Sequence, residues 1–234
     1  MTSHRHVAHA PQHPPATAKH HPNRGSRARS RDMHEQHRDC EEERAQSIPE
    51  SVRPPAADHP VNGGGDLIVG FDVETTGIGE HDIITVACAW SPCGVRVACF
   101  HGEDFSPLLD VLDRAKYIYT FNGIDFDFPR LAKTCGRDMA PWLKKTVDPL
   151  FMMKGVLGFG ACMKLDNLLI ANGFECKSGS GLEAVRLWKE GNRTALSSYC
   201  MDDARLTYEL CAVPSILWGK WRVQLREARA VSFV

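Results

Sequence analysis

The stretch Leu67-Ile-Val-Gly-Phe-Asp-Val-Glu74 decides the fold. Its mostly apolar composition predicts a β-strand that is covered on both faces. Side chains alternate between the two faces of a strand, so Asp72 and Glu74 point to the same side. Phe71 and Val73 point to the other side, into the core. Two adjacent carboxylates on a buried strand repel each other, and a cation between them would offset that cost. The pair is therefore a candidate metal site, the alternative being two surface acids.

A further carboxylate lies in a predicted amphipathic helix at Thr194–Ala212. The core-facing stripe of this helix has spacings of three and four, and it consists of Leu196, Tyr199, Asp203, Leu206 and Leu210. Asp203 is in the middle of the stripe, where an unpaired carboxylate is costly to bury, and Tyr199 is one turn earlier on the same face. Asp202 is the competing acid, but it falls outside the stripe. In the alternative interpretation, the helix is half exposed and Asp203 pairs with an arginine.

The run Tyr117-Ile-Tyr-Thr-Phe-Asn-Gly-Ile-Asp-Phe-Asp-Phe-Pro129 carries the third signal. It predicts a strand that ends at Asn122-Gly123, followed by a short helix that starts near Asp127–Pro129. A carboxylate is thereby placed where the chain turns from strand to helix. The pattern alone leaves both Asp125 and Asp127 as candidates.

The other periodicities predict an α/β domain with a mixed sheet flanked by helices. Further strands are expected at 82–90, 95–101 and 147–153, and further helices at 105–116, 165–171 and 182–190. The segment from Trp218 to Val234 fits either a closing strand pair or a short helix.

Residues 1–63 have a different composition from the rest of the chain. They are rich in His, Pro, Arg and Ala and lack long apolar runs, which predicts a disordered tail. Asn62-Gly-Gly-Gly65 marks its end, so we expect a domain at 64–214 and a C-terminal extension at 215–234 that packs on it. The basic segment Arg24–Arg31 is expected to be a solvated arm, with nucleic-acid binding or a localisation signal as alternatives. A transit peptide is a further alternative, but prolines disfavour the amphipathic helix it needs.

Overall composition narrows the class of protein. The net charge of −1 does not mark a nucleic-acid binder, so contact with a polyanion needs local basic patches or bound cations. Nine cysteines without a Cys-x-x-Cys pair favour free thiols over a disulfide framework or a zinc ribbon. The sequence has no stretch of membrane-spanning length and no apolar secretory signal. We therefore expect an intracellular protein, in the cytoplasm or nucleus and not secreted, that does not act at a membrane.

The three motifs, taken in order, resemble those of the DEDD 3′–5′ exonucleases of the ribonuclease H-like superfamily. Phe71-Asp-Val-Glu-Thr-Thr-Gly77 is similar to the first motif, Asp-x-Glu. Asn122-Gly-Ile-Asp-Phe-Asp127 is similar to the second, Asn-x-x-x-Phe-Asp, and the resemblance selects Asp127 over Asp125. Tyr199-Cys-Met-Asp-Asp203 matches the Tyr-x-x-x-Asp motif of the tyrosine subclass. The histidine subclass would have histidine where this chain has Ser198.

The resemblance covers about residues 66–213 and is closest to stand-alone YprB-type exonuclease domains and to the proofreading domains of family B DNA polymerases. The stretch Lys177–Gly191 is also similar to that group. Ala204 departs from the valine that is usual in the family, a change expected to matter little.

The resemblance implies a ribonuclease H-like fold and a two-metal mechanism. Asp72, Glu74, Asp127 and Asp203 would hold two Mg²⁺ or Mn²⁺ ions about 4 Å apart, one activating the attacking water and one stabilising the leaving 3′ oxygen. Tyr199 would orient that water. The pocket for the terminal nucleotide would be lined by Thr75, Thr76 and Asn122.

The expected substrate is the 3′ end of single-stranded DNA or RNA, with a replication or repair complex as a further partner. Lys177, Arg186 and Lys189 are candidates for phosphate contacts, or alternatively a solvated helix face. Two other functions remain open. One is a ribonuclease H-type endonuclease, which shares the sheet and the metals. The other is a catalytically silent nucleic-acid-binding module.

Overall fold

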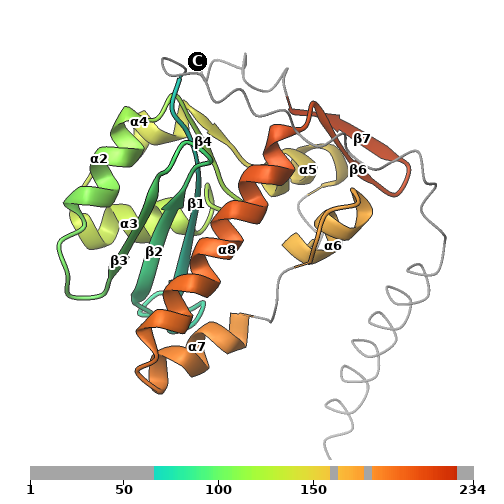
Figure 1. Cartoon of the computed structure of the whole chain (residues 1–234). Coiled ribbons are helices and arrows are strands. Elements are labelled where there is room, and N and C mark those ends of the chain that lie inside the picture. Colours follow the sequence, from blue (N-terminus) through green and yellow to red (C-terminus); the bar gives the residue numbers. More distant parts are fainter. Residues whose placement is uncertain (1–65, 159–162, 177–180, 226–234) are drawn as a thin grey trace, which may run out of the picture. The chain divides into compact units, whose positions relative to one another are not determined.

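The computed structural model describes residues 66–158, 163–176 and 181–225 (Figure 1). The expected tail, with its basic segment, and Lys177 lie outside these ranges. Within them, no helix is both long and apolar enough to cross a membrane.

A five-stranded mixed sheet in the order β3-β2-β1-β4-β5 forms the centre of the fold. The strands β1 (Ile68–Thr75), β2 (Ile84–Trp90) and β3 (Arg96–Phe100) are antiparallel neighbours. The strands β4 (Tyr117–Tyr119) and β5 (Thr146–Val147) extend the sheet in parallel beyond β1. The α/β architecture with a mixed sheet flanked by helices, which the sequence predicts, is confirmed.

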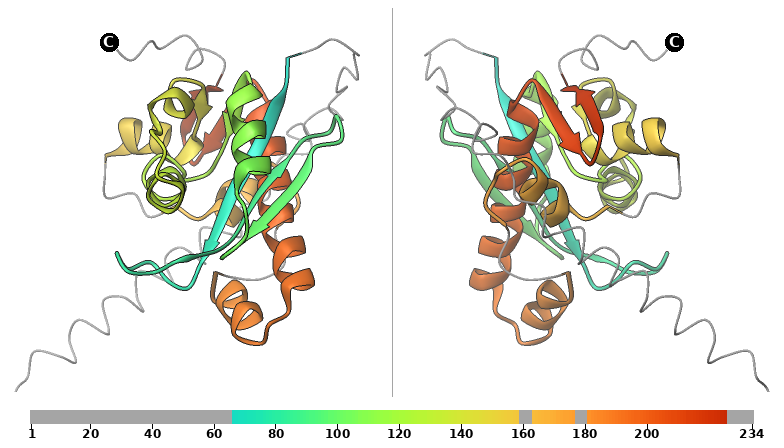
Figure 2. Two further views of the ribbon diagram at one scale, coloured as in Figure 1. Left: turned by 90° about the vertical axis from the view of Figure 1, so that its left-hand side faces the viewer. Right: turned by 90° about the vertical axis from the view of Figure 1, so that its right-hand side faces the viewer.

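Helices cover the two faces of the sheet (Figures 1 and 2). One face packs against α2 (Ser106–Arg114), α3 (Asp127–Cys135) and α4 (Ala140–Leu143). The other is crossed by the long helix α8 (Arg193–Ala212), on which α7 (Gly181–Lys189) packs. The remaining helices of the described residues are α5 (Pro149–Leu157) and α6 (Leu165–Ala171).

The first face of β1 is apolar, as its alternation predicts. Val69 and Phe71 are fully buried and Val73 is 5% exposed. The ring of Phe71 stacks on Phe128 of α3 with centroids 5.3 Å apart, and Phe128 in turn lies 6.0 Å from Trp142 of α4. This face therefore contributes ordinary core packing.

On the second face, α8 comes unusually close to β1. A Cβ atom at Gly70 would lie 2.0 Å from the backbone oxygen of Ala204, so only glycine permits this approach. Because Ala204 follows Asp203 directly, the close approach brings the carboxylate of Asp203 towards β1.

Two expectations from the sequence need correction. The strand expected at Val147–Met153 is wrong beyond Val147, because a helix starts at Pro149. Asp148 caps that helix by accepting a hydrogen bond from the backbone N–H of Phe151, and proline is favoured in the first helical turn. The strand expected at 117–122 ends at Tyr119, and the short helix α4 was not expected at all.

Up to residue 225, the C-terminal segment forms a strand pair, and the expectation for residues 226–234 lies outside the described residues. The strands β6 (Ser215–Trp218) and β7 (Trp221–Gln224) form an antiparallel hairpin. Ile216 and Val223 are buried in the same cluster as Leu206 and Leu210 of α8. The hairpin therefore packs on α6 and shares a core cluster with the helix that carries Asp203. Cysteines in the described residues are all free thiols.

Candidate metal centre

Three carboxylates from β1 and α8 converge on the second face of the sheet. Asp72, Glu74 and Asp203 each offer an oxygen atom, and these three atoms lie within 4.8 Å of one another. Asp203 is only 4% exposed, and Asp72 and Glu74 are half-buried. Clustered carboxylate oxygens in a partly dry site suit hard cations such as Mg²⁺ or Mn²⁺. These residues could therefore hold a metal ion.

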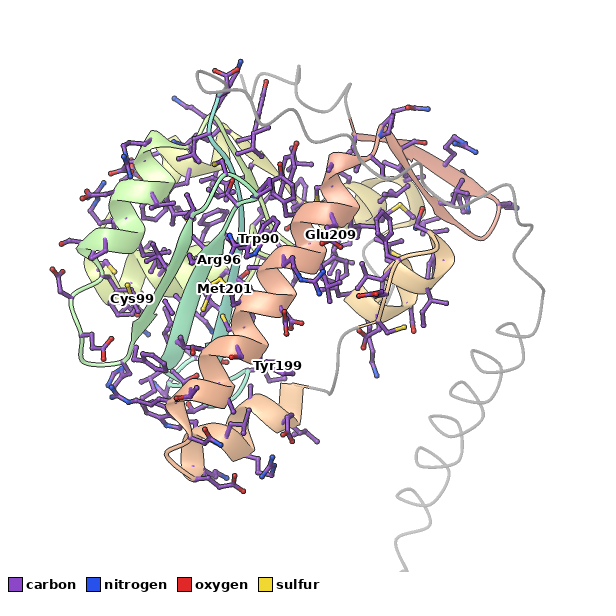
Figure 3. All side chains as sticks on the ribbon, in the orientation of Figure 1. Trp90, Arg96, Cys99, Tyr199, Met201 and Glu209 are labelled. Carbon is purple, nitrogen blue, oxygen red and sulfur yellow. The ribbon has the colours of Figure 1, made fainter. Side chains whose placement is uncertain are left out.

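The packing of α8 agrees with the stripe predicted from the sequence. Tyr199 lies one turn before Asp203, on the part of the helix nearer α7 (Figure 3), and is 8% exposed. The three leucines of the stripe are buried: Leu196, Leu206 and Leu210. Asp202 is exposed and lies 3.6 Å from Arg205, which confirms that it faces away from the buried side.

Asp127 is a fourth carboxylate next to this cluster, but it does not belong to the group of three. It is the first residue of α3, is 3% exposed, and accepts a 3.0 Å hydrogen bond from the hydroxyl of Thr120. Burial, and then the nearby charge of Asp72, raise the pKa of Asp127 well above its usual value. A neighbouring cation would relieve both effects, because it favours the charged carboxylate.

Asp125, the other candidate in this motif, faces a different partner. Its carboxylate lies 2.8 Å from the ammonium group of Lys154, and its side chain is 46% exposed. Asp127 is buried beside Asp72, whereas Asp125 forms a surface ion pair. The geometry therefore favours Asp127 as the metal-site residue.

The turn that delivers Asp127 is held by a buried carboxylate that sequence reasoning missed. Asp148 is 2% exposed and accepts hydrogen bonds from the backbone N–H groups of Asn122 (3.0 Å) and Ile124 (3.1 Å). Burial raises the pKa of Asp148, although these N–H donors oppose the shift. Asn122 has a positive φ of 67°, a conformation that needs such support.

Gly123 is the second requirement of this turn. A Cβ atom there would lie 2.0 Å from the hydroxyl oxygen of Thr120, the group that donates to Asp127. A side chain at this position would therefore displace the Thr120–Asp127 hydrogen bond. The tight turn at Asn122-Gly123 therefore helps to set the position of Asp127.

A second residue that the sequence did not single out is Cys200, the neighbour of Tyr199. Its thiol donates to both the backbone oxygen and the Oδ2 atom of Asp72, at 3.5 Å in each case. Burial first, and then Cys88 and the adjacent carboxylates, raise the pKa of Cys200 well above its usual value. The thiol is therefore a neutral donor that helps to hold Asp72.

The residues expected to line the nucleotide pocket have defined partners. The hydroxyl of Thr75 donates to the backbone oxygen of Gly77 (2.6 Å), and that of Thr76 donates to Asp82 (2.7 Å). These hydroxyls shape the loop after β1. The side-chain oxygen of Asn122 accepts from Lys154 at 3.2 Å.

Of the basic residues expected to meet phosphate, Arg186 is already engaged. It forms ion pairs with Glu183 and Glu190 on the same helix, both shorter than 2.7 Å between charged atoms. Lys189 is exposed. Because two acids surround Arg186, its charge is offset locally, and it is a weaker candidate for phosphate binding than its sequence position indicated.

Comparison with known proteins agrees with this geometry at the level of the fold. Residues 69–213 match a family model described as the RNase_H superfamily. A search of curated protein sequences finds no match. Among solved structures, the chain is similar to a family B DNA polymerase from the hyperthermophilic archaeon Pyrobaculum calidifontis, with 19% sequence identity and a TM-score of 0.48. The similarity covers 62% of this chain and 24% of the polymerase, so the chain spans about a quarter of that protein.

Proposed function

Because the chain belongs to the RNase H superfamily, we propose that it is a metal-dependent 3′–5′ exonuclease that hydrolyses phosphodiester bonds of single-stranded nucleic acid. The observation that carries the proposal is the convergence of Asp72, Glu74 and Asp203 within 4.8 Å, with Asp127 buried beside Asp72. Four carboxylates in one place are costly without a cation, and they supply the oxygen ligands that two divalent ions need.

Each residue has a distinct role in this proposal. Asp72, Glu74, Asp127 and Asp203 would bind Mg²⁺ or Mn²⁺. The bound cations would supply an activated water and neutralise charge on the scissile phosphate. The hydroxyl of Tyr199 would orient the water by a hydrogen bond. It would not act as the base that deprotonates this water, because a phenol with a pKa near 10 is a poor base. Thr75, Thr76 and Asn122 would border the terminal nucleotide, and a replication or repair complex would supply the 3′ ends.

The test uses linear single strands of DNA and RNA that carry a label at the 5′ end. Purified protein is incubated with each strand in Mg²⁺, in Mn²⁺ and in EDTA. We expect a ladder of products that shortens from the 3′ end with either metal and no cleavage in EDTA. Asp203→Asn serves as the matched inactive variant, because it removes a ligand charge and keeps the side-chain shape.

A covalently closed single-stranded circle separates the alternatives. An exonuclease leaves the circle intact, whereas a ribonuclease H-type endonuclease cuts it. A silent binding module binds both circle and linear strand and cleaves neither. Cleavage of the circle, or binding without hydrolysis in either metal, would therefore reject the exonuclease proposal.

A further inference from the structure

Lys154 is placed beside the turn that carries the second acidic motif. It lies on α5, the helix capped by Asp148, and Asp148 also holds the backbone of Asn122 and Ile124. The ammonium group of Lys154 lies 3.2 Å from Oδ1 of Asn122 and 2.8 Å from Oδ2 of Asp125. Its side chain is 17% exposed, so the charge is largely buried against the turn but still reaches solvent.

We propose that Lys154 binds a backbone phosphate of the substrate strand and that Asp125 is the counter-ion it exchanges for that phosphate. The proposal rests on the function proposed above. It assigns a substrate contact to a basic residue outside the three motifs.

The charges around the turn support this assignment. A strand that approaches Asp72, Glu74, Asp127 and Asp203 meets a negative field, so a fixed cation near its path lowers the cost of approach. An ammonium group has three donors, and Asn122 and Asp125 account for two of the partners of Lys154. The carboxylate of Asp125 is 46% exposed and can return to water when a phosphate replaces it.

Two other cations among the described residues have partners within the protein. Arg130 donates to the backbone oxygens of Ile78 and Phe126, and Arg186 is held by two glutamates. Lys154 differs from both, because Arg130 donates to backbone oxygens and Arg186 is shared between two acids, whereas Lys154 has a single charged partner, the 46% exposed side chain of Asp125. Lys154 is therefore better suited than either arginine to exchange its charged partner for a phosphate.

The competing interpretation is that the Lys154–Asp125 ion pair is only a clamp on the turn. The two interpretations predict opposite signs for Asp125→Asn. If the pair is a clamp, removing either partner breaks the same interaction and has the same effect. If Lys154 binds phosphate, removing Asp125 releases Lys154 for the substrate, whereas removing Lys154 deletes the contact.

The experiment measures the affinity of the full chain for a fluorescent single-stranded oligonucleotide at several KCl concentrations, with Ca²⁺ in place of the catalytic metal. Lys154→Met should weaken binding by about three- to tenfold and lower the salt slope by about 0.7, the value for one phosphate contact on a single strand. Lys154→Arg should keep the slope. Asp125→Asn should tighten binding by about two- to threefold, since one negative charge near the strand is lost.

A matched control pair lies at the other end of β1. Lys116 and Asp66 form an exposed ion pair there, before the strand begins. Lys116→Met and Asp66→Asn make the same changes in net charge as the test variants. Both should leave the salt slope unchanged and the affinity within about twofold of the parent, which separates a local contact from a change in overall charge.

The results distinguish failure of this inference from failure of the proposed function. Weaker binding in both Lys154→Met and Asp125→Asn, or an unchanged slope in Lys154→Met, would overturn the phosphate contact while the parent still binds and cleaves. A parent that neither binds nor cleaves any strand would overturn the proposed function itself. If Lys154→Met does not fold, judged by its melting curve, Lys154→Gln and the sign of the Asp125→Asn effect decide the matter.

Discussion

The side chains on the two faces of β1 belong to one strand but have different roles. On one face, Phe71 and Val73 pack against α3 and its neighbours and are almost fully buried. On the other, Asp72 and Glu74 meet Asp203 of α8 within 4.8 Å. The first arrangement stabilises the fold through apolar burial, and the second opposes folding unless a cation is present. Because its side chains alternate, the strand places core residues on one face and candidate metal ligands on the other. Substitutions on one face should therefore change stability, and substitutions on the other should change activity.

The largest expected effect concerns the acidic side. Asp127→Asn should lower turnover by several orders of magnitude, because the metal site loses a buried charge. Its melting temperature without metal should be at or above that of the parent at neutral pH, since Asn can keep the hydrogen bond to Thr120 and carries no charge to bury.

Asp125→Asn is the control for this substitution. It changes the same chemical group two residues away, in a surface ion pair, so its turnover at saturating substrate should stay within about threefold of the parent. Single-turnover rates of both variants measure the difference. If Asp125→Asn proved the more damaging change, the second motif would be misassigned.

The apolar face should respond in the opposite way. Phe71→Ala should lower the free energy of unfolding by about 3–5 kcal/mol, because a fully buried ring that stacks on Phe128 leaves a cavity. Turnover per folded molecule should change little. Urea unfolding combined with an active-site titration measures both quantities. A large loss of turnover in fully folded protein would show that the two faces are not independent.

Tyr199→Phe tests a residue that is both packed and functional. The ring stays in place and only the hydroxyl is lost, so stability should change by about 1 kcal/mol or less. Turnover should fall by roughly ten- to a thousandfold, because the water loses its orientation while the metals remain. Mn²⁺ affinity should be unchanged, in contrast to Asp203→Asn. Full activity in Tyr199→Phe would reduce the tyrosine to a core residue.

The smallest effect concerns pH in the metal-free protein. The pKa of Asp127 is raised in the folded state, whereas the unfolded chain loses this proton near pH 3.9. Above that pH the folded state binds more protons, so the free energy of unfolding falls as pH rises through the folded pKa. We expect the melting temperature in EDTA to fall more steeply, as pH rises above about 4, in the parent than in Asp127→Asn. Identical slopes would indicate that Asp127 titrates normally.

Local patterns predicted much of this arrangement. The alternation in β1 and the helical stripe that holds Asp203 need only the periodicity of one element, and both agree with the structure. The strand expected at Val147–Met153 is wrong beyond Val147, because Asp148 and Pro149 are a helix-start signal that overrides the apolar run around them.

Other features depend on contacts between distant segments. Asp148 supports Asn122 from 26 residues further along the chain, and Cys200 reaches Asp72 across 128 residues. Nothing in the sequence around either residue indicates those partners. The close approach of α8 at Gly70 likewise becomes visible only when helix and strand are packed together.

The central claim is that the acidic face of β1, together with Asp203, binds divalent cations. Titration of the metal-free protein with Mn²⁺, followed by calorimetry and by electron paramagnetic resonance, tests it directly. We predict two bound ions per chain, a higher melting temperature with Mn²⁺, and loss of at least one ion in Asp203→Asn but not in Phe71→Leu. A parent that binds no Mn²⁺ at millimolar concentration, or an Asp203→Asn variant that binds it as the parent does, would contradict the account.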